Sequence, residues 1–170
     1  MKGKHAERFI ESWGSIGVLW GINRSMARIH AFLLISEDPM DLDTISASLK
    51  VSRGNASMSL KELRNWGVIQ RVHLPGERRD YYIAEHDAMR MFFEIAGERK
   101  RREFDPALHA LRLLLAEADT EKYKKAHRRL TDVENMMTTI DRILNKCLEN
   151  EKMSKAVLGI LKGFVAKRPH

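Results

Sequence analysis

The sequence predicts a mostly α-helical protein with one small β-hairpin, which is an α+β fold class. Three observations predict it. Apolar residues recur at the spacing of amphipathic helices along most of the 170-residue chain. Residues 68–84 alone show two short runs separated by a turn, as a hairpin requires. Near the C-terminal end, apolar residues follow steps of three and four, which is a heptad pattern.

Two helices are expected before the hairpin. The first covers about residues 5–19 and ends before Gly21. Asn23 can cap the second, which covers about residues 24–36 and consists mostly of apolar side chains. Within it, His30 is expected to be a satisfied core or interface histidine rather than a metal ligand.

Two short helices and a tight turn are expected next. Asp43 is the expected N-cap of the first, and residues 51–53 form the turn. Ser52 is the expected N-cap of the second helix, Arg53–Trp66, and Gly67 is suited to the position just after its end.

The helix at 53–66 has two different faces. Ala56, Leu60 and Leu63 follow the spacing of one buried stripe. The opposite face is small and polar, which suits close contact with another surface, and its first turn can attract a phosphate. That face carries Gly54, Ser57, Met58, Lys61 and Asn65, with Asn55 and Glu62 at one edge.

A basic hairpin follows this helix. The expected strands are residues 68–74 and 80–84, joined by a turn at 75–79 that exposes Arg78 and Arg79. Either Glu77 or Asp80 is expected to orient one of these arginines. Between residues 50 and 79 the chain has seven basic and two acidic residues. A helix–turn–helix with a basic hairpin, or wing, is typical of DNA-binding domains.

Composition limits the other function classes. The net charge of +7 suits a polyanionic partner. The single cysteine, Cys147, excludes an intrachain disulfide and is expected to be inert packing in a helical stripe. No apolar run reaches the length of a membrane span, and Glu7 and Glu11 lie where a signal peptide would be apolar. We therefore expect a soluble, cytoplasmic protein without a membrane partner.

Residues 87–102 are expected to form a helix with Met89, Phe92, Phe93 and Ala96 turned inward. Its basic end, residues 98–102, either touches a DNA backbone or is a solvated helix end. The pair Asp105-Pro106 predicts the start of a new helix, with an N-cap followed by proline.

The longest helix is expected from Thr120 to about Asn150, and a last amphipathic helix covers residues 153–166. At about 30 residues the long helix would extend about 45 Å, too far to be buried inside one small domain. We therefore expect a homodimer in which helices of two subunits pack together; a purely intrachain bundle is the alternative. The expected dimerisation residues are Leu130, Val133, Met137, Ile140, Leu144 and Cys147.

The segment SRGNASMSLKELRNWGVIQRV followed by PGERRDYY resembles the winged helix of the MarR superfamily, in its GbsR-like branch. FIESWGSIGVLWGINRSMARIHAFLLIS is similar to the N-terminal region of the same branch, and the resemblance covers roughly residues 5–95. It implies a dimeric prokaryotic transcriptional regulator that binds DNA and responds to a small ligand. By position, it implies a recognition helix at 53–66 and a wing at 73–82.

The leading hypothesis is therefore a winged helix-turn-helix protein that binds double-stranded DNA as a homodimer. Residues 1–104 would form the DNA-binding region and residues 105–170 the dimerisation region. Bases are expected to meet Asn55, Ser57, Met58 and Lys61, with Gly54 allowing close approach. Phosphates are expected to meet Ser52, Arg53, Arg64, Arg78 and Arg79.

Two alternatives remain. A protein-interaction module could use the same fold without DNA, and Met58 on the outer helix face favours it. A small-molecule effector, a cation, could bind an aromatic cage, although aromatic residues at helical spacing more often form a core. The cage residues would be Trp13, Trp20, Phe92, Phe93 and Tyr123. The sequence has no metal-binding, phosphate-loop or nucleophile-elbow motif, so we expect no cofactor and no enzymatic activity.

Overall fold

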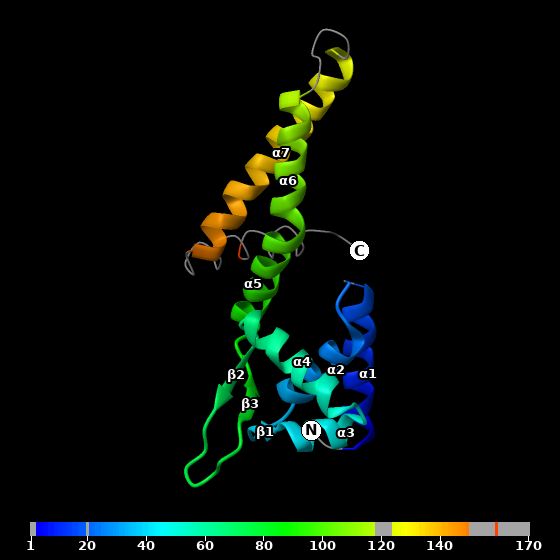
Figure 1. The fold of residues 1–170 in the computed structure, drawn as a ribbon, viewed down its shortest axis with the longest axis vertical. Helices are drawn as coiled ribbons and strands as arrows, with labels where there is room; N and C mark the ends of the chain where they lie inside the picture. Colours follow the sequence, from blue (N-terminus) through cyan, green and yellow to red (C-terminus); the bar gives the residue numbers. More distant parts are fainter. Residues whose placement is uncertain (1–2, 20, 118–123, 150–158, 160–170) are drawn as a thin grey trace. The chain divides into compact units, whose positions relative to one another are not determined.

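The computed structural model describes residues 3–19, 21–117, 124–149 and 159. The chain divides into two compact units, Met1–Ile95 and Ala96–His170. The mostly helical fold class with a small antiparallel sheet is confirmed. The elements, labelled in Figure 1, are α1 (Lys4–Leu19), α2 (Arg24–Leu34), β1 (Met40–Asp41), α3 (Leu42–Leu49), α4 (Arg53–Asn65), β2 (Ile69–Val72), β3 (Tyr81–Ala84), α5 (Ala88–Arg99), the π-helix η1 (Lys100–Phe104), α6 (Asp105–Glu117) and α7 (Lys124–Glu149).

Helix α2 is the centre of the first unit. It packs against α1, α3, α4 and β3, and six of its eleven residues are buried. Its Ile29 and Leu33 are almost fully buried, as are Ile45 of α3, Leu60 of α4 and Val68 before β2. Because these side chains form one cluster, α4 has a fixed place on the unit's surface.

Small residues allow α1 to lie very close to α2. A Cβ atom added to Gly17 would lie 2.5 Å from the Cβ of Ala27, and one added to Gly14 would lie 2.7 Å from the Cγ of Arg28. Both distances are shorter than ordinary contacts, so glycine is needed at both places for this approach.

Helix caps confirm two expectations and correct one. Asn23 caps α2, and its Oδ1 accepts hydrogen bonds from the backbone N–H groups of Ser25 and Met26. Ser52 caps α4 by accepting from the N–H of Asn55. The cap of α3 is Asp41, however, and not Asp43. The helix begins two residues earlier than expected, because Asp41 is extended and its Oδ1 accepts from the N–H of Thr44 at 2.8 Å.

The sheet contains a strand that the sequence analysis missed. The order is β1-β3-β2, with both pairings antiparallel. The two-residue β1 pairs Met40 with Tyr82 and Asp41 with Tyr81. It is too short to give a sequence pattern, yet it ties the start of β3, next to the hairpin turn, to the start of α3. Gly67 has φ +74° directly after α4, as expected for a residue that ends a helix and turns the chain.

A helix, α6, begins at Asp105 as expected, but the expectation that Asp105 is its N-cap is wrong. The chain passes from η1 into α6 without interruption, and Asp105 has helical backbone angles. The π turn supplies the reason: the N–H of Asp105 bonds to the carbonyl of Lys100, five residues back. The Asp105 carboxylate, instead of capping a helix, accepts a hydrogen bond from Lys100 Nζ at 2.7 Å.

The basic run at 98–102 is not a free cationic patch: Arg101 and Arg102 are exposed to solvent, but their charges are paired. Lys100 is buried, and its Nζ lies 2.7 Å from Asp105 and 2.8 Å from Asp141 of α7. Arg101 and Arg102 both pair with the buried carboxylate of Glu98. Carboxylates of the same unit therefore neutralise this run.

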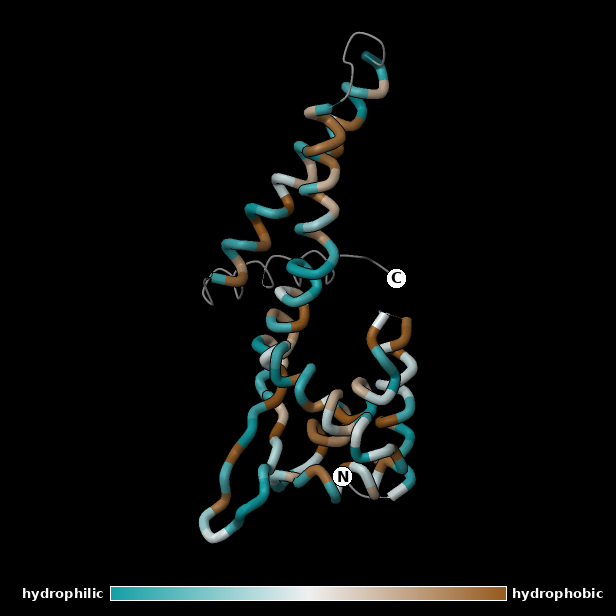
Figure 2. The backbone as a smooth tube through the Cα atoms, viewed as in Figure 1, coloured by the Kyte–Doolittle hydropathy of each residue, from teal (hydrophilic) through white to brown (hydrophobic). Residues whose placement is uncertain are grey.

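Within the second unit, α6 and α7 lie side by side (Figure 1). The Arg112 guanidinium joins them, donating to Glu134 and to the Thr138 hydroxyl at 2.8 Å each. Along α7, hydrophobic and hydrophilic stretches alternate, as Figure 2 shows. None of the helices within the described residues is long and apolar enough to cross a lipid bilayer.

Candidate nucleic-acid interface

Helix α4 presents one buried and one exposed face, as the sequence predicts. Ala56, Leu60 and Leu63 are at most 3% exposed and lie in the core of the first unit. Of the residues expected on or beside the outer face, Glu62 at its edge is half-buried, and these are exposed: Ser52, Arg53, Gly54, Asn55, Ser57, Met58, Lys61, Arg64 and Asn65. A Cβ atom added to Gly54 would meet no atom within 4 Å, so the first turn is open to a partner.

Asn55 is held in a defined position on this face. Its Nδ2 donates to the Ser25 hydroxyl at the start of α2 at 3.2 Å, and its Oδ1 accepts from the Ser59 hydroxyl at 3.3 Å. An amide side chain has two N–H groups and two lone pairs on oxygen, so one of each remains. This arrangement orients Asn55 while leaving it able to form a bidentate contact with a base.

Two aspartates beside α3 hold two of the interface arginines. Arg53, the first residue of α4, pairs with Asp43 at 2.8 Å. Arg79 of the hairpin pairs with Asp41 at 2.7 Å and with Asp43 at 3.8 Å. The start of the outer helix and the hairpin are therefore tied to the same short acidic segment.

The expectation that Glu77 or Asp80 orients one of the two hairpin arginines is wrong. Arg79 pairs with Asp41 and Asp43, because β1 brings these residues next to the start of β3, beside the hairpin turn. Asp80 instead lies 3.1 Å from Arg71 and 3.7 Å from His73. Across the described residues, no ion pair or hydrogen bond holds Arg78, which is exposed in the β2–β3 turn.

The hydrogen-bond partners of Asp41 keep its carboxyl group ionised. Hydrogen bonds from Thr44, followed by the bond from Arg79, lower the pKa of its carboxyl to about 2. The hydrogen bond to Asp41, with the charges of Asp41 and Asp43, raises the pKa of Arg79. At neutral pH the carboxylate is therefore a permanent anion beside the hairpin.

Three of the seven cations between residues 50 and 79 are thus paired with carboxylates outside that window: Arg53 with Asp43, Arg71 with Asp80, and Arg79 with Asp41. The other four have no acidic partner among the described residues and are exposed: Lys50, Lys61, Arg64 and Arg78. They lie on α4, on the turn before it and on the hairpin, and they are the cations available to a polyanion without loss of an internal pair.

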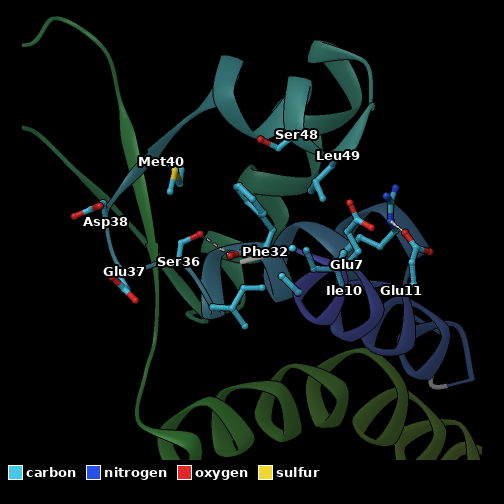
Figure 3. Close-up of a pocket in the computed structure, with 14 residues that line it drawn as sticks. Glu7, Ile10, Glu11, Phe32, Ser36, Glu37, Asp38, Met40, Ser48 and Leu49 are labelled. Atoms are coloured by element: carbon cyan, nitrogen blue, oxygen red, sulfur yellow. Dashed lines mark hydrogen bonds and ion pairs between the residues drawn. The ribbon is translucent and has the colours of Figure 1, made fainter. Parts of the chain in front are cut away.

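The first unit also contains a pocket that is lined by acidic side chains. This pocket of about 410 Å³ is lined by α1, α2, the segment that follows α2 and the end of α3, as Figure 3 shows. Ile10, Phe32 and Leu49 contribute apolar surface to it. Its carboxylates belong to Glu7, Glu11, Glu37 and Asp38, and Arg28 is its one cationic side chain. Such a lining disfavours phosphate, so the pocket is not part of the cationic surface on α4.

His30 is a core residue, as expected, but it is not satisfied. It is 3% exposed, and its Nε2 has no hydrogen-bond partner. Burial lowers the pKa of the imidazole to about 4, so it is neutral at neutral pH. Its ring centroid lies 6.0 Å from that of Trp13. Within the described ranges, no group of three or more His, Cys, Asp or Glu side chains is arranged to hold a metal ion.

The other expected site residues fall into two groups. On α7, Leu130, Val133 and Ile140 are 39–41% exposed, whereas Met137 and Leu144 are half-buried and Cys147 is buried. Of the aromatic cage, Trp20 and Tyr123 lie outside the described residues, as does the expected helix at 153–166. Trp13 stacks on Phe9, and Phe92 contacts Phe93 edge-on, so these rings pack in separate pairs. Phe92 is 52% exposed, which corrects its expected inward position.

Sequence reasoning missed Ser25, Asp41 and Asp43 as supports of the interface. The sequence Asp-Leu-Asp is the only local sign of these supports, and its pattern predicts a helix cap alone.

Comparison with known proteins gives a consistent result, although no family model matches the chain. The HTH-type transcriptional repressor GbsR of Bacillus subtilis is 27% identical over 104 residues, which are 61% of this chain but only 56% of that protein. The HTH-type transcriptional regulator MmpR5 of Mycobacterium tuberculosis is 23% identical over 141 residues, 82% of each chain. A crystal structure of a transcriptional regulator matches with a TM-score of 0.65 and 21% identity, covering 85% of this chain and 96% of that one. The fold is that of a known regulator, and the resemblance drawn from the sequence is confirmed.

Proposed function

We propose that this winged helix-turn-helix protein of the MarR superfamily is a sequence-specific regulator of transcription that binds double-stranded DNA as a homodimer. The sequence similarity to GbsR and MmpR5 supports this proposal, because both are named as HTH-type regulators of transcription. One observation carries the proposal: the exposed face of α4 is small and polar, and both it and the adjoining hairpin carry cations that have no acidic partner among the described residues. We assign DNA binding to residues 1–104 and dimerisation to residues 105–170.

The contacts follow from the geometry of α4 and the hairpin. Helix α4 would enter the major groove, with Asn55, Ser57, Met58 and Lys61 toward base edges. The hairpin would lie along the backbone or in the minor groove, with Arg78 toward a phosphate. Arg53 and Arg79 would hold α4 and the hairpin in register through Asp43 and Asp41.

The dimer is supported by the exposed apolar stripe of α7. This helix has 26 described residues, about 39 Å at 1.5 Å per residue. Leu130, Val133 and Ile140 are too exposed for residues of an intrachain core, and Met136 and Ile143 beside them are 57% and 51% exposed. A second subunit would cover these side chains. Two recognition helices related by a two-fold axis would then read a pseudo-palindromic site with half-sites about 34–36 Å apart.

Modulation by a small ligand is the last part of the proposal. We expect a small organic cation, because aromatic rings attract cations and because the pocket between α1 and α2 is lined by carboxylates. A tetraalkylammonium ion would serve as the probe. A change in DNA affinity on its addition, absent with sodium at equal ionic strength, would support this part, and an unchanged affinity would remove it.

Selection of duplexes from a random pool, followed by a salt titration of the selected site, tests the main proposal. A DNA-binding regulator should enrich a two-fold-symmetric sequence. With four unpaired cations per subunit the slope of log affinity against log salt can approach about −7 for a dimer, at about 0.9 per phosphate. Failure to enrich any sequence, with no salt-dependent binding, would instead favour a protein-interaction module.

A further inference from the structure

Met58 is the exception on a surface that is otherwise small and polar. Its side chain is 76% exposed on the outer face of α4. Among the described residues between 21 and 91, it is the one large hydrophobic side chain that is exposed; the others are buried or half-buried. A methionine in this place gains little from the protein core, and its side chain is available to a partner.

The neighbours of Met58 do not form an apolar patch with it. One turn before it lies Gly54, and the residues beside it on the same face are Ser57 and Lys61, all exposed. A protein partner usually meets a contiguous apolar patch with a well-packed centre. A single methionine among polar residues and cations instead fits a polar, anionic partner that displays small isolated apolar groups.

Double-stranded DNA displays one such group in its major groove. The C5-methyl group of thymine projects beside the hydrogen-bonding edges of the bases. Methionine is flexible and polarizable, so it can adapt to a methyl group without demanding one fixed geometry. Side chains on a helix lean toward its N-terminus, which directs Met58 over the turn that contains Gly54, where no side chain would keep a base edge away.

We propose that Met58 is a specificity-determining residue that contacts the C5-methyl group of a thymine in each half-site of the operator. The inference rests on the proposed function and adds one chemical requirement to it. The selected operator should contain a thymine at one fixed position per half-site, and the methyl group itself, not the hydrogen-bonding pattern of the base, should be recognised.

Replacement of thymine by deoxyuridine tests this directly, because it removes only the methyl group. Each thymine of the selected duplex is replaced in turn, and binding is measured for the wild-type protein, Met58→Ala and Met58→Leu. For the wild type, one position per half-site should cost about four-fold in affinity for each methyl, from the transfer free energy of one buried carbon group. Met58→Ala should bind the thymine duplex more weakly and should not distinguish it from the uracil duplex. Met58→Leu, which keeps an apolar side chain, should retain the discrimination.

Because Met58 is exposed, the alanine variant should fold normally. The inference is overturned if the wild type tolerates uracil at every thymine, or if Met58→Ala suffers the same uracil penalty as the wild type. In both cases sequence-specific binding would persist and the proposed function would stand. If the wild type enriches no duplex at all, the proposed function itself fails and takes this inference with it.

Discussion

The two arginines of the hairpin turn should behave differently, although they are adjacent in the sequence. Arg78 has no ion pair within the part of the chain that the structure describes, whereas Arg79 lies 2.7 Å from Asp41. We therefore expect Arg78→Ala to remove a phosphate contact and Arg79→Ala to remove a support of the hairpin. From the sequence alone, both would contact phosphates, and their double replacement would lower the salt slope of a dimer by roughly 3–4.

Because Arg79 is paired in the structure, the expected change in the salt slope is half as large. One phosphate per subunit is two per dimer, so Arg78→Ala should lower the magnitude of the slope by about 1.8 at 0.9 per contact. Arg79→Ala should weaken binding to all sequences while changing the slope by much less. Fluorescence anisotropy of a labelled duplex over a range of salt concentrations measures both quantities.

Asp41→Asn is the matched control, because asparagine still caps α3 but does not hold Arg79 with a negative charge. In this variant Arg79 is released, and the slope should become steeper rather than shallower. Equal losses of about 1.8 for Arg78→Ala and Arg79→Ala, with no change in Asp41→Asn, would show that Arg79 contacts DNA and would refute the positioning role.

Three further predictions concern assembly, pH and base recognition. Leu144→Asp or Ile140→Asp should yield monomer or unfolded chain in sedimentation, and an unchanged folded dimer would contradict the assignment of α7. Because His30 has a folded pKa of about 4 against 6.5 when unfolded, the folded state binds fewer protons between these values. Stability to urea should therefore fall as the pH drops from about 6.5 to 4, by roughly 3 kcal/mol in total, and His30→Gln should flatten this dependence. Lys61→Ala and Asn55→Ala should change base preference at a cost on the order of 1–3 kcal/mol; uniform weakening on all sequences would make them phosphate contacts or supports.

The parts of the fold that local rules determine could be predicted from the sequence. Ser52 caps α4 through a hydrogen bond to a residue three positions away, and Gly67 ends the same region with a positive φ. The inward stripe of Ala56, Leu60 and Leu63 follows from helical periodicity alone. In each case the cause and the effect lie within one or two helical turns.

Features that depend on distant residues could not be predicted in the same way. The strand β1 has two residues, and its partner β3 lies about forty positions later, so no local pattern reveals it. Lys100 in the π turn pairs with Asp141, which is supplied by another helix, so its burial could not be read from its neighbours in the sequence. The pattern at Asp105-Pro106 marks the start of α6 correctly, but the π turn before it takes the place of an N-cap.

The net charge of a stretch of sequence can exceed the charge that the folded interface offers to DNA. The window from 50 to 79 has a net charge of +5, yet three of its arginines face aspartates that lie just outside it. A regulator needs some cations to attract DNA and others to hold the reading elements in place, and only the first kind contributes to the salt slope. Asp41 and Asp43 assign Arg53 and Arg79 to the second kind. Their carboxylates neutralise these two arginines, and the ion pairs connect α3 with α4 and with the hairpin. The affinity of this protein for DNA of any sequence should therefore depend on carboxylates that never touch a base.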